Sequence, residues 1–237
     1  MSTQPQFPII MIKEVKALAK QLGYIIYSKP HCVNIWGFRA NSNKPNSFDD
    51  EMHVFMNISN TNRKKWAYWV FKCTTDPGTY WLRNPMNPQG TAILNSGQYP
   101  NSHALGLHRG KYKALVQVGQ MSVTRDYDRD AVLDFNNGKT QKGRYGINIH
   151  RASKTGTTYT VDKYSAGCQV FKNASDFDFF ITLCEKHRKL HGNLFTYTLV
   201  DKRSEFRKEK LKTVTIAGAI IGLLVGGYFL ISNSDHE

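Results

Sequence analysis

The sequence predicts a β-rich α+β domain with flanking helices, followed by one transmembrane helix near the C-terminal end. Three observations predict this: short runs of aromatic and β-branched residues between turn residues, two segments with helical periodicity, and one long uncharged apolar run. The 237 residues are 41% hydrophobic and 12% aromatic, enough for one large domain or two small ones. We expect a single domain over residues 1–201.

Two segments of this domain have the periodicity of amphipathic helices. In residues 13–22 and 174–191, apolar side chains recur at positions i, i+3 and i+4, and a glycine follows each segment. Asn173 or Ser175 is a suitable cap for the second helix, because their side chains accept hydrogen bonds from the first free N–H groups. We interpret both as helices that pack on the core.

Between the helices, short runs rich in aromatic and β-branched residues predict strands, and clusters of Gly, Pro and Asn predict the turns between them. Residues 60–63 are a plausible hairpin turn, and residues 41–47 form a loop. The expected strands cover residues 25–27, 33–38, 53–58, 66–71, 113–118, 120–125, 146–149, 169–171 and 195–200.

The C-terminal region predicts a membrane anchor. Residues 214–231 carry no charge and, as a helix, would span about 27 Å, close to the thickness of a bilayer core. The alternative, a buried core helix, is disfavoured by the uniform apolarity and the basic residues that precede it. We therefore expect a basic juxtamembrane segment at 202–212, a transmembrane helix at 213–231 and a short tail at 232–237.

The flanks of this helix predict its orientation. Six Lys and Arg residues precede the helix within 202–212, and none follow it, so the positive-inside rule places the large domain in the cytoplasm. No secretory signal is expected at the N-terminus. Gly218, Gly222 and Gly226 share one helix face, a spacing that permits close helix–helix contact and self-association.

The net charge of +14 indicates an acidic partner, whether nucleic acid, anionic lipid or an anionic cell-wall polymer. The sequence has no zinc-finger spacing and no aromatic-basic RNA-binding motif, so nucleic acid is not expected. No cofactor or metal is expected either. The run from Asp126 to Asp130 resembles the start of a calcium loop, but Ala131 stands where such a loop needs glycine, and Asn137 where it needs glutamate.

Four widely spaced cysteines form neither a zinc motif nor a disulfide framework. Cys32, Cys73 and Cys184 lie in strand-like or helical contexts and are predicted to be packing residues. Cys168 differs, because it follows a glycine and has a histidine, His150, upstream at the end of a predicted strand. The alternative for this pair is a buried thiol and a hydrogen-bonded core histidine.

A thiol needs a nearby base to become a nucleophile near neutral pH. His150 could supply that base if the two predicted strands lie side by side. The loop between them, residues 151–164, is long enough to arch over a substrate. Gly167 has no side chain, so the backbone amides of Gly167 and Cys168 could stabilise an oxyanion.

The segments 146–151 and 164–171 resemble the signature of the YkuD family of L,D-transpeptidases, in which a histidine precedes Ser/Thr-His-Gly-Cys-hydrophobic-Asn/Arg. The resemblance implies a YkuD-like mixed β sheet or barrel and peptidoglycan stem peptides as substrates. It assigns roles to five residues. Cys168 would be the nucleophile and His150 the base, Arg151 would orient His150 through its carbonyl, and Ser165 and Gly167 would shape the oxyanion hole.

Two departures from this pattern matter. Ala166 replaces the second histidine, and Gln169-Val170 replaces the hydrophobic-Asn/Arg pair. These losses motivate an alternative hypothesis, a non-enzymatic, membrane-anchored structural or lysis-accessory protein on a degenerate YkuD scaffold. A further alternative is a basic adaptor that binds anionic lipid.

Other stretches resemble uncharacterised proteins of bacteriophages that infect Bacteroidetes, whose domain ends in a similar Ser-Ala-Gly-Cys-Gln-Val-Phe run. The resemblance covers residues 74–78, 90–94, 108–112 and 125–130. It implies a phage-encoded cell-wall enzyme or lysis factor. Such a role conflicts with the charge rule, because peptidoglycan lies outside the cytoplasmic membrane.

His108 and Arg109 precede Gly110 in a predicted turn. Arginine offers a bidentate fork to a carboxylate, so we consider this pair a candidate binding site for the carboxylate of a stem peptide. A solvated turn without a binding role is the alternative interpretation.

Overall fold

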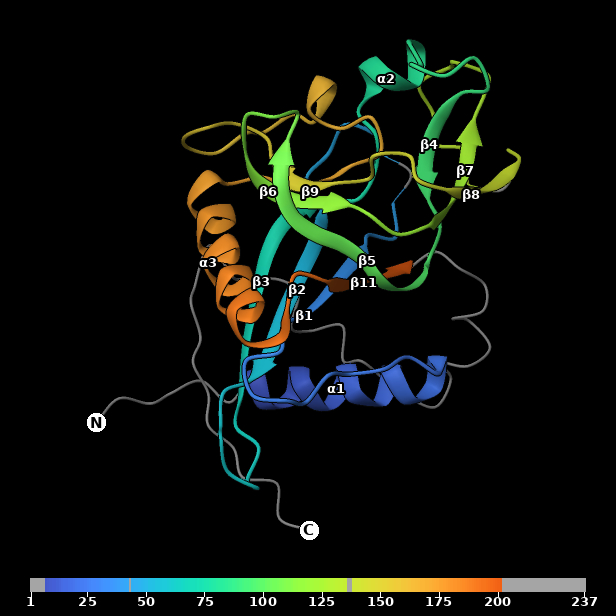
Figure 1. Ribbon diagram of the computed structural model, residues 1–237. Helices are drawn as coiled ribbons and strands as arrows, with labels where there is room; N and C mark the ends of the chain where they lie inside the picture. The colour runs from blue at the N-terminus through green and yellow to red at the C-terminus, as the bar shows by residue number, and fades with distance from the viewer. Residues whose placement is uncertain (1–6, 43, 136–137, 202–237) are drawn as a thin grey trace.

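The computed structural model describes residues 7–42, 44–135 and 138–201, which form a β-rich α+β fold (Figure 1). Eight strands close into a barrel, and three further strands form a second sheet. Helix α1 packs on the outer surface of the barrel, and helix α3 lies beside it (Figure 1). The β-rich α+β class predicted from the sequence is thereby confirmed.

Around the barrel, the strands follow the order β1-β11-β5-β6-β9-β10-β3-β2. Two neighbouring pairs are parallel, β1 with β11 and β9 with β10, and the other pairs are antiparallel. The barrel strands are β1 (Asn34–Arg39), β2 (Asp50–Asn57), β3 (Trp66–Thr74), β5 (Gly97–His108), β6 (Tyr112–Gln117), β9 (Ile149–Arg151), β10 (Gln169–Phe171) and β11 (Phe195–Asp201).

Helix α3 (Ala174–His191) has the bounds that its sequence pattern predicts. The side chain of Asn173 accepts the N–H groups of Ser175 and Asp176, which caps the first turn. Its apolar face, including Phe177 and Phe180, packs into the same core cluster as the residues that point into the barrel. Burial of this face, rather than helix propensity alone, holds α3 against the barrel.

Helix α1 (Phe7–Leu22) covers the outer surface of β1, β2 and β3. It begins before the segment that the periodicity predicts, 13–22. Ile12, Val15 and Ala19 are buried against an aromatic layer that includes Trp36 and Tyr68. The outward faces of these strands are therefore buried too, so that burial is nearly continuous along each strand instead of alternating.

The second sheet has the order β4-β7-β8 and lies beyond one end of β5, near the short helix α2 (Figure 1). Leu82 of α2 packs on Ile93 of β4, together with Leu133 from the loop that follows β7. The remaining elements are β4 (Thr91–Leu94), β7 (Met121–Asp126), β8 (Thr140–Gly143), α2 (Thr79–Arg83) and the 3₁₀ turn η1 (Asp162–Tyr164).

Residues 25–27 were expected to form a strand and do not. Side-chain amides replace a neighbouring strand there. Gln98 exchanges two hydrogen bonds with the backbone of Ile25, and Asn34 does the same with Tyr27, all at 2.8–2.9 Å. The segment is extended, but its backbone partners are side chains, which strand propensity does not detect.

Strands β4, β5 and β8 and the short elements α2 and η1 were not predicted. Strand β5 contains Gly97, Pro100 and Asn101, and Asn101 has a φ of 50°. These residues are typical of turns, and the register against β11 shifts at this part of β5. A bulged strand with only three buried residues among its twelve lacks the alternating pattern by which strands are recognised.

The predicted juxtamembrane segment, transmembrane helix and tail (202–237), with Gly218, Gly222 and Gly226, lie outside the described residues. Among the described helices, none is long and apolar enough to cross a bilayer.

A buried ionic cluster lies where β1, the end of β3 and the end of β11 meet. The guanidinium of Arg39 is 2.8 Å from a carboxylate oxygen of Asp76 and 3.2 Å from one of Asp201. Asp50 accepts the N–H of Ala40 at 2.6 Å and both the N–H and the hydroxyl of Thr75. Arg39 is 1% exposed, so its charge depends on these carboxylates.

Removal of the arginine charge should destabilise the fold strongly. We expect Arg39→Met to lower the free energy of unfolding by about 3–5 kcal/mol, because it leaves buried carboxylates without a counter-charge. Urea unfolding followed by tryptophan fluorescence measures the change. Arg83→Met, at an exposed position of α2, is the control. Equal unfolding midpoints for the two variants would contradict the expectation.

Candidate active site

The candidate catalytic residues lie on two adjacent parallel strands. Strand β9 pairs with β10 so that Ile149 lies opposite Gln169 and His150 lies opposite Val170. The N–H of Gln169 donates to the carbonyl of Asn148 at 2.8 Å, which extends the pairing by one residue toward Cys168.

Side chains alternate along a strand, so the ring of His150 shares a face with Val170 and, two residues earlier, with Cys168. Strand spacings place the Cα atoms of Cys168 and His150 about 8 Å apart, a separation that the two side chains together span. The fold thus brings together the pair that the sequence singles out.

His150 is held by its own strand end. Its Nδ1 lies 2.8 Å from the carbonyl oxygen of Arg151 and 3.2 Å from the hydroxyl of Tyr112, and that hydroxyl donates to the same carbonyl. We assign the Nδ1–H tautomer, because the carbonyl can only accept. This leaves Nε2 with a lone pair, as a general base requires. The Arg151 carbonyl lies where the YkuD resemblance implies.

A second imidazole covers His150. The rings of His108 and His150 stack with centroids 4.1 Å apart. His108 is buried at the end of β5, and its Nδ1 contacts the side-chain amide of Asn148 at 3.1 Å. Burial, then the charge of a protonated His108 and of Arg109, lowers the pKa of His150 to about 3, although its bond to the Arg151 carbonyl opposes this shift. His150 is therefore neutral near pH 7.

Cys168 is half-buried and its thiol donates to the carbonyl of Gly146 at 3.3 Å. Burial raises the pKa of the thiol, while the backbone N–H of Asn148 and the charge of Arg109 act in the opposite direction. Both side chains are thus neutral, a thiol and an imidazole on one face of the paired strands. The other three cysteines are buried, as predicted for packing residues.

The turn before Cys168 is closed by Ser165. Its hydroxyl donates to the carbonyl of Cys168 at 2.8 Å and accepts the N–H of Gly167 at 3.1 Å. Ser165 is fully buried, and its own carbonyl accepts the N–H of Gly78. This geometry differs from one expectation. The N–H of Gly167 was expected to donate to an oxyanion, but it donates to the hydroxyl of Ser165. Of the two amides proposed, the one of Cys168 remains as the candidate donor.

Gln169 anchors the same turn from inside the barrel. Its side chain accepts the hydroxyl of Tyr197 at 2.7 Å and donates to the carbonyls of Gly167 and Thr75. The glutamine therefore replaces a hydrophobic residue of the YkuD pattern with a buried, fully hydrogen-bonded one. Val170, in the position of the family's Asn or Arg, packs in a small apolar cluster.

Arg109 lies at the rim of the site, exposed, in the three-residue turn between β5 and β6, with a φ of 50°. Its positive charge acts on both Cys168 and His150. His108 and Arg109 were grouped as a substrate-binding pair. The two side chains lie in different environments: His108 is buried against His150, whereas Arg109 faces solvent.

Sequence reasoning missed Tyr112 and Asn148. The tight hairpin pairs Tyr112 with His108, so the sequence His-Arg-Gly-Lys-Tyr, read as a hairpin, would have placed this hydroxyl beside the histidines. Asn148 shares the outward face of its strand with His150. Across residues 7–42, 44–135 and 138–201, no group of three or more His, Cys, Asp or Glu side chains is arranged to hold a metal ion.

The depressed pKa of His150 predicts a pH dependence of stability. The unfolded chain takes up a proton near pH 6.5 and the folded site only near pH 3, so stability is full above pH 6.5 and falls as the pH falls between these values. Between pH 7 and pH 5 this proton uptake should lower the free energy of unfolding of the wild type by about 2 kcal/mol, and we expect His150→Gln to lack this loss.

Chemical unfolding at the two pH values measures this difference. His191→Gln, an exposed histidine on the same chain, is the control variant. An unchanged pH dependence in His150→Gln would show that the imidazole is charged, or solvated, in the folded protein.

Gly167 is constrained by both conformation and space. Its φ is +113°, and a Cβ there would overlap the backbone carbonyl of Ala92 in β4. We expect Gly167→Ala to cost about 3 kcal/mol or more, the upper end of local backbone strain, and to displace Cys168. Gly156→Ala is the matched control, because Gly156 also has a positive φ but meets no atom within 4 Å. Thermal unfolding should separate the two variants, and equal losses would contradict the overlap.

Comparison of the chain with protein-family models, with curated proteins and with solved structures gave no match in any of the three.

Proposed function

We propose that this protein is a cysteine-dependent acyltransferase or amidase that acts on peptide amides, with peptidoglycan stem peptides as its substrate class. One observation carries the proposal: β9 and β10 pair so that His150 and Cys168 share one face. The Arg151 carbonyl contacts Nδ1 of His150, which leaves the lone pair on Nε2. The resemblance of this segment to the YkuD signature supports the choice of substrate.

The proposed reaction begins with the neutral pair. As the sulfur of Cys168 attacks the amide carbonyl, its proton moves to Nε2 of His150, and the carbonyl oxygen becomes an oxyanion. The N–H of Cys168 is the proposed donor to that oxyanion. When the tetrahedral intermediate collapses, His150 returns the proton to the leaving amine and a thioester remains. Water or a second amine then attacks the thioester, which gives hydrolysis or transpeptidation.

Several neighbours support these steps. The carbonyl of Arg151 and the hydroxyl of Tyr112 hold the imidazole in one orientation and stabilise its protonated form. Arg109, exposed at the rim, is placed to attract a substrate carboxylate. The predicted anchor at 213–231 would hold the domain at the membrane, with the side of the membrane set by its basic flank.

Two observations favour a second candidate function, a non-enzymatic structural or lysis-accessory role on a degenerate YkuD scaffold. Burial raises the pKa of Cys168, whereas the activated thiols of cysteine enzymes commonly have a lowered pKa. The valine that faces His150 also removes a polar group from the substrate side of the family pattern.

Acylation by a strained amide tests the enzymatic proposal. A carbapenem presents a reactive lactam carbonyl, and we expect intact-mass spectrometry of the full chain in detergent to show one adduct, located on Cys168 by peptide mapping. Loss of a general base costs about 10²–10⁴-fold, so His150→Gln should acylate at least about 100-fold more slowly.

Cys168→Ala should show no adduct, and Cys184→Ala, which removes a buried thiol, should acylate like the wild type. A folded wild-type chain that forms no adduct, and whose Cys168 alkylates at the same rate with and without His150, would favour the non-enzymatic role.

A further inference from the structure

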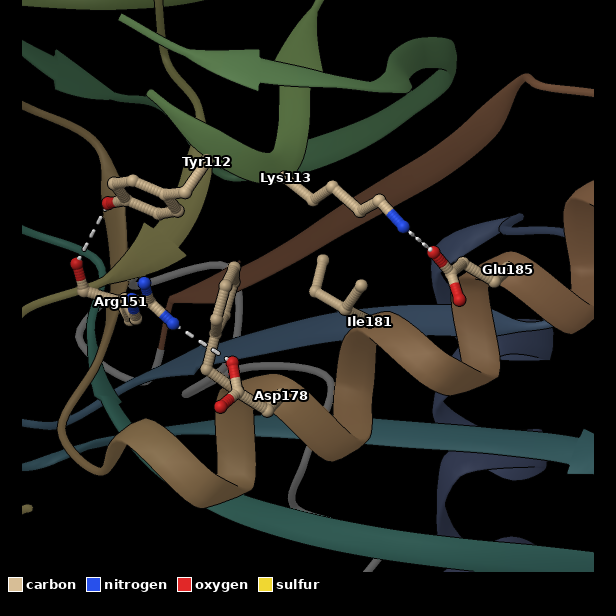
Figure 2. Close-up of a pocket in the computed structure, with 7 residues that line it drawn as sticks. Tyr112, Lys113, Arg151, Asp178, Ile181 and Glu185 are labelled. Atoms are coloured by element: carbon tan, nitrogen blue, oxygen red, sulfur yellow. Dashed lines mark hydrogen bonds and ion pairs between the residues drawn. The ribbon is translucent and has the colours of Figure 1, made fainter. Parts of the chain in front are cut away.

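A pocket of about 350 Å³ lies between strand β6 and helix α3, and none of its lining residues is the candidate nucleophile or base (Figure 2). Its volume is at the small end of the range for ligand sites. Tyr112 and Lys113 come from β6 and Arg151 from the end of β9, and the opposite wall is one face of α3.

The pocket lies on the opposite face of β9 from the candidate active site. Arg151 pairs with Phe171, which belongs to the barrel core, whereas His150 pairs with the outward Val170. Because side chains alternate, the guanidinium of Arg151 and the ring of His150 point to different faces. The two sites share only the Tyr112 side chain and the Arg151 backbone.

Apolar groups form the floor of the pocket. The ring of Phe177 packs edge-on against Tyr112, with centroids 6.4 Å apart, and Ile181 lies between the two charged ends (Figure 2). The guanidinium of Arg151 lies 4.6 Å from the centroid of the Tyr112 ring, which limits its movement. Such a floor suits the backbone and small side chains of an extended ligand.

Two ion pairs bound this floor, and in each pair one partner is less exposed than the other. The Arg151 side chain is 16% exposed and pairs at 3.0 Å with Asp178, which is 62% exposed. Glu185 is 32% exposed and pairs at 2.5 Å with Lys113, which is 66% exposed. The less exposed charges are therefore a cation at one end and an anion at the other, and the more exposed partners are exchanged at little cost.

The spacing of these charges selects the ligand. Asp178 and Glu185 are seven residues apart on one face of α3, a rise of about 10 Å. A free amino acid is too short to reach both ends. An extended chain advances about 3.3–3.6 Å per residue, so about three residues span the distance.

We infer that this pocket binds a short peptide of about three residues with both ends free, its carboxylate on Arg151 and its ammonium on Glu185. The peptide replaces Asp178 at the arginine and Lys113 at the glutamate, and its backbone lies over Phe177 and Ile181. This binding site is separate from the proposed acyl-transfer site, and its occupancy is measured without any reaction.

Calorimetric titration of the full chain in detergent with trialanine tests the inference. We expect saturable binding, and loss of at least about tenfold in affinity when the peptide is N-acetylated or C-amidated, because each change removes one charge-assisted bond. Dialanine should bind more weakly than trialanine. Equal binding of the free and doubly blocked peptides, or no binding of trialanine, would overturn the inference.

Within each ion pair, variants of the two partners should affect trialanine affinity differently. Arg151→Gln and Glu185→Gln remove the anchors and should each weaken trialanine binding about tenfold or more. Asp178→Asn and Lys113→Gln remove the exposed competitors and should leave affinity unchanged or raise it. Circular dichroism confirms folding of each variant. A loss in Asp178→Asn as large as that in Arg151→Gln would overturn the proposed exchange of partners.

These readouts are independent of the candidate nucleophile. Cys168→Ala should bind trialanine like the wild type, so failure of carbapenem acylation leaves this test intact, and failure of peptide binding leaves the acylation test intact. Loss of trialanine binding in Cys168→Ala would place the peptide at the nucleophile and overturn the assignment to the β6–α3 pocket.

Discussion

Two short strands, β9 and β10, run parallel through the barrel wall, and the candidate site exists only while they remain paired. The N–H of Gln169 on the carbonyl of Asn148 continues the ladder to the residue after Cys168. Parallel strands need a crossover connection, and here residues 152–168 make it. A slip of one residue in this register would turn His150 into the barrel core and place Ile149 beside the thiol.

The turn that presents Cys168 is tied to the buried charges of the barrel. Gln169 donates to the carbonyl of Thr75, and the hydroxyl and N–H of Thr75 donate to Asp50 in the cluster around Arg39. Cys168 is thus held from inside by a chain of buried polar contacts as well as by Ser165 from within the turn. Buried networks of this kind impose one geometry, since a partly satisfied arrangement costs more than an apolar one.

The predictability of each part follows from how local its physical determinants are. Helix α3 could be predicted to the residue because its cap, its apolar spacing and its terminal glycine all lie within the segment. Strand β5 could not, because its place in the barrel depends on partners in β6 and β11, and its own residues favour turns. The extended segment at 25–27 depends on amides of Gln98 and Asn34, which sequence periodicity does not contain.

The candidate site shows the same division. Cys168, His150 and Ser165 could be singled out from one stretch of sequence, and the structure brings them together. The stacking of His108 on His150 and the contact of Tyr112 with it depend on the β5–β6 hairpin, which is remote in the chain. The occupied amide of Gly167 also could not be foreseen, because Ser165 is only one of several possible partners for it.

The neutral resting state of the pair constrains how any acyl transfer would proceed. The rings of His108 and His150 stack 4.1 Å apart, so a charge on one imidazole disfavours protonation of the other. Burial of Cys168 disfavours a thiolate before substrate binds. Charge separation must therefore develop together with attack. The Arg151 carbonyl would stabilise the positive charge on His150, and Arg109 and the backbone N–H of Asn148 the negative charge on the sulfur. A substrate that excludes water from this face would strengthen each of these interactions, so binding and activation of the thiol become one step.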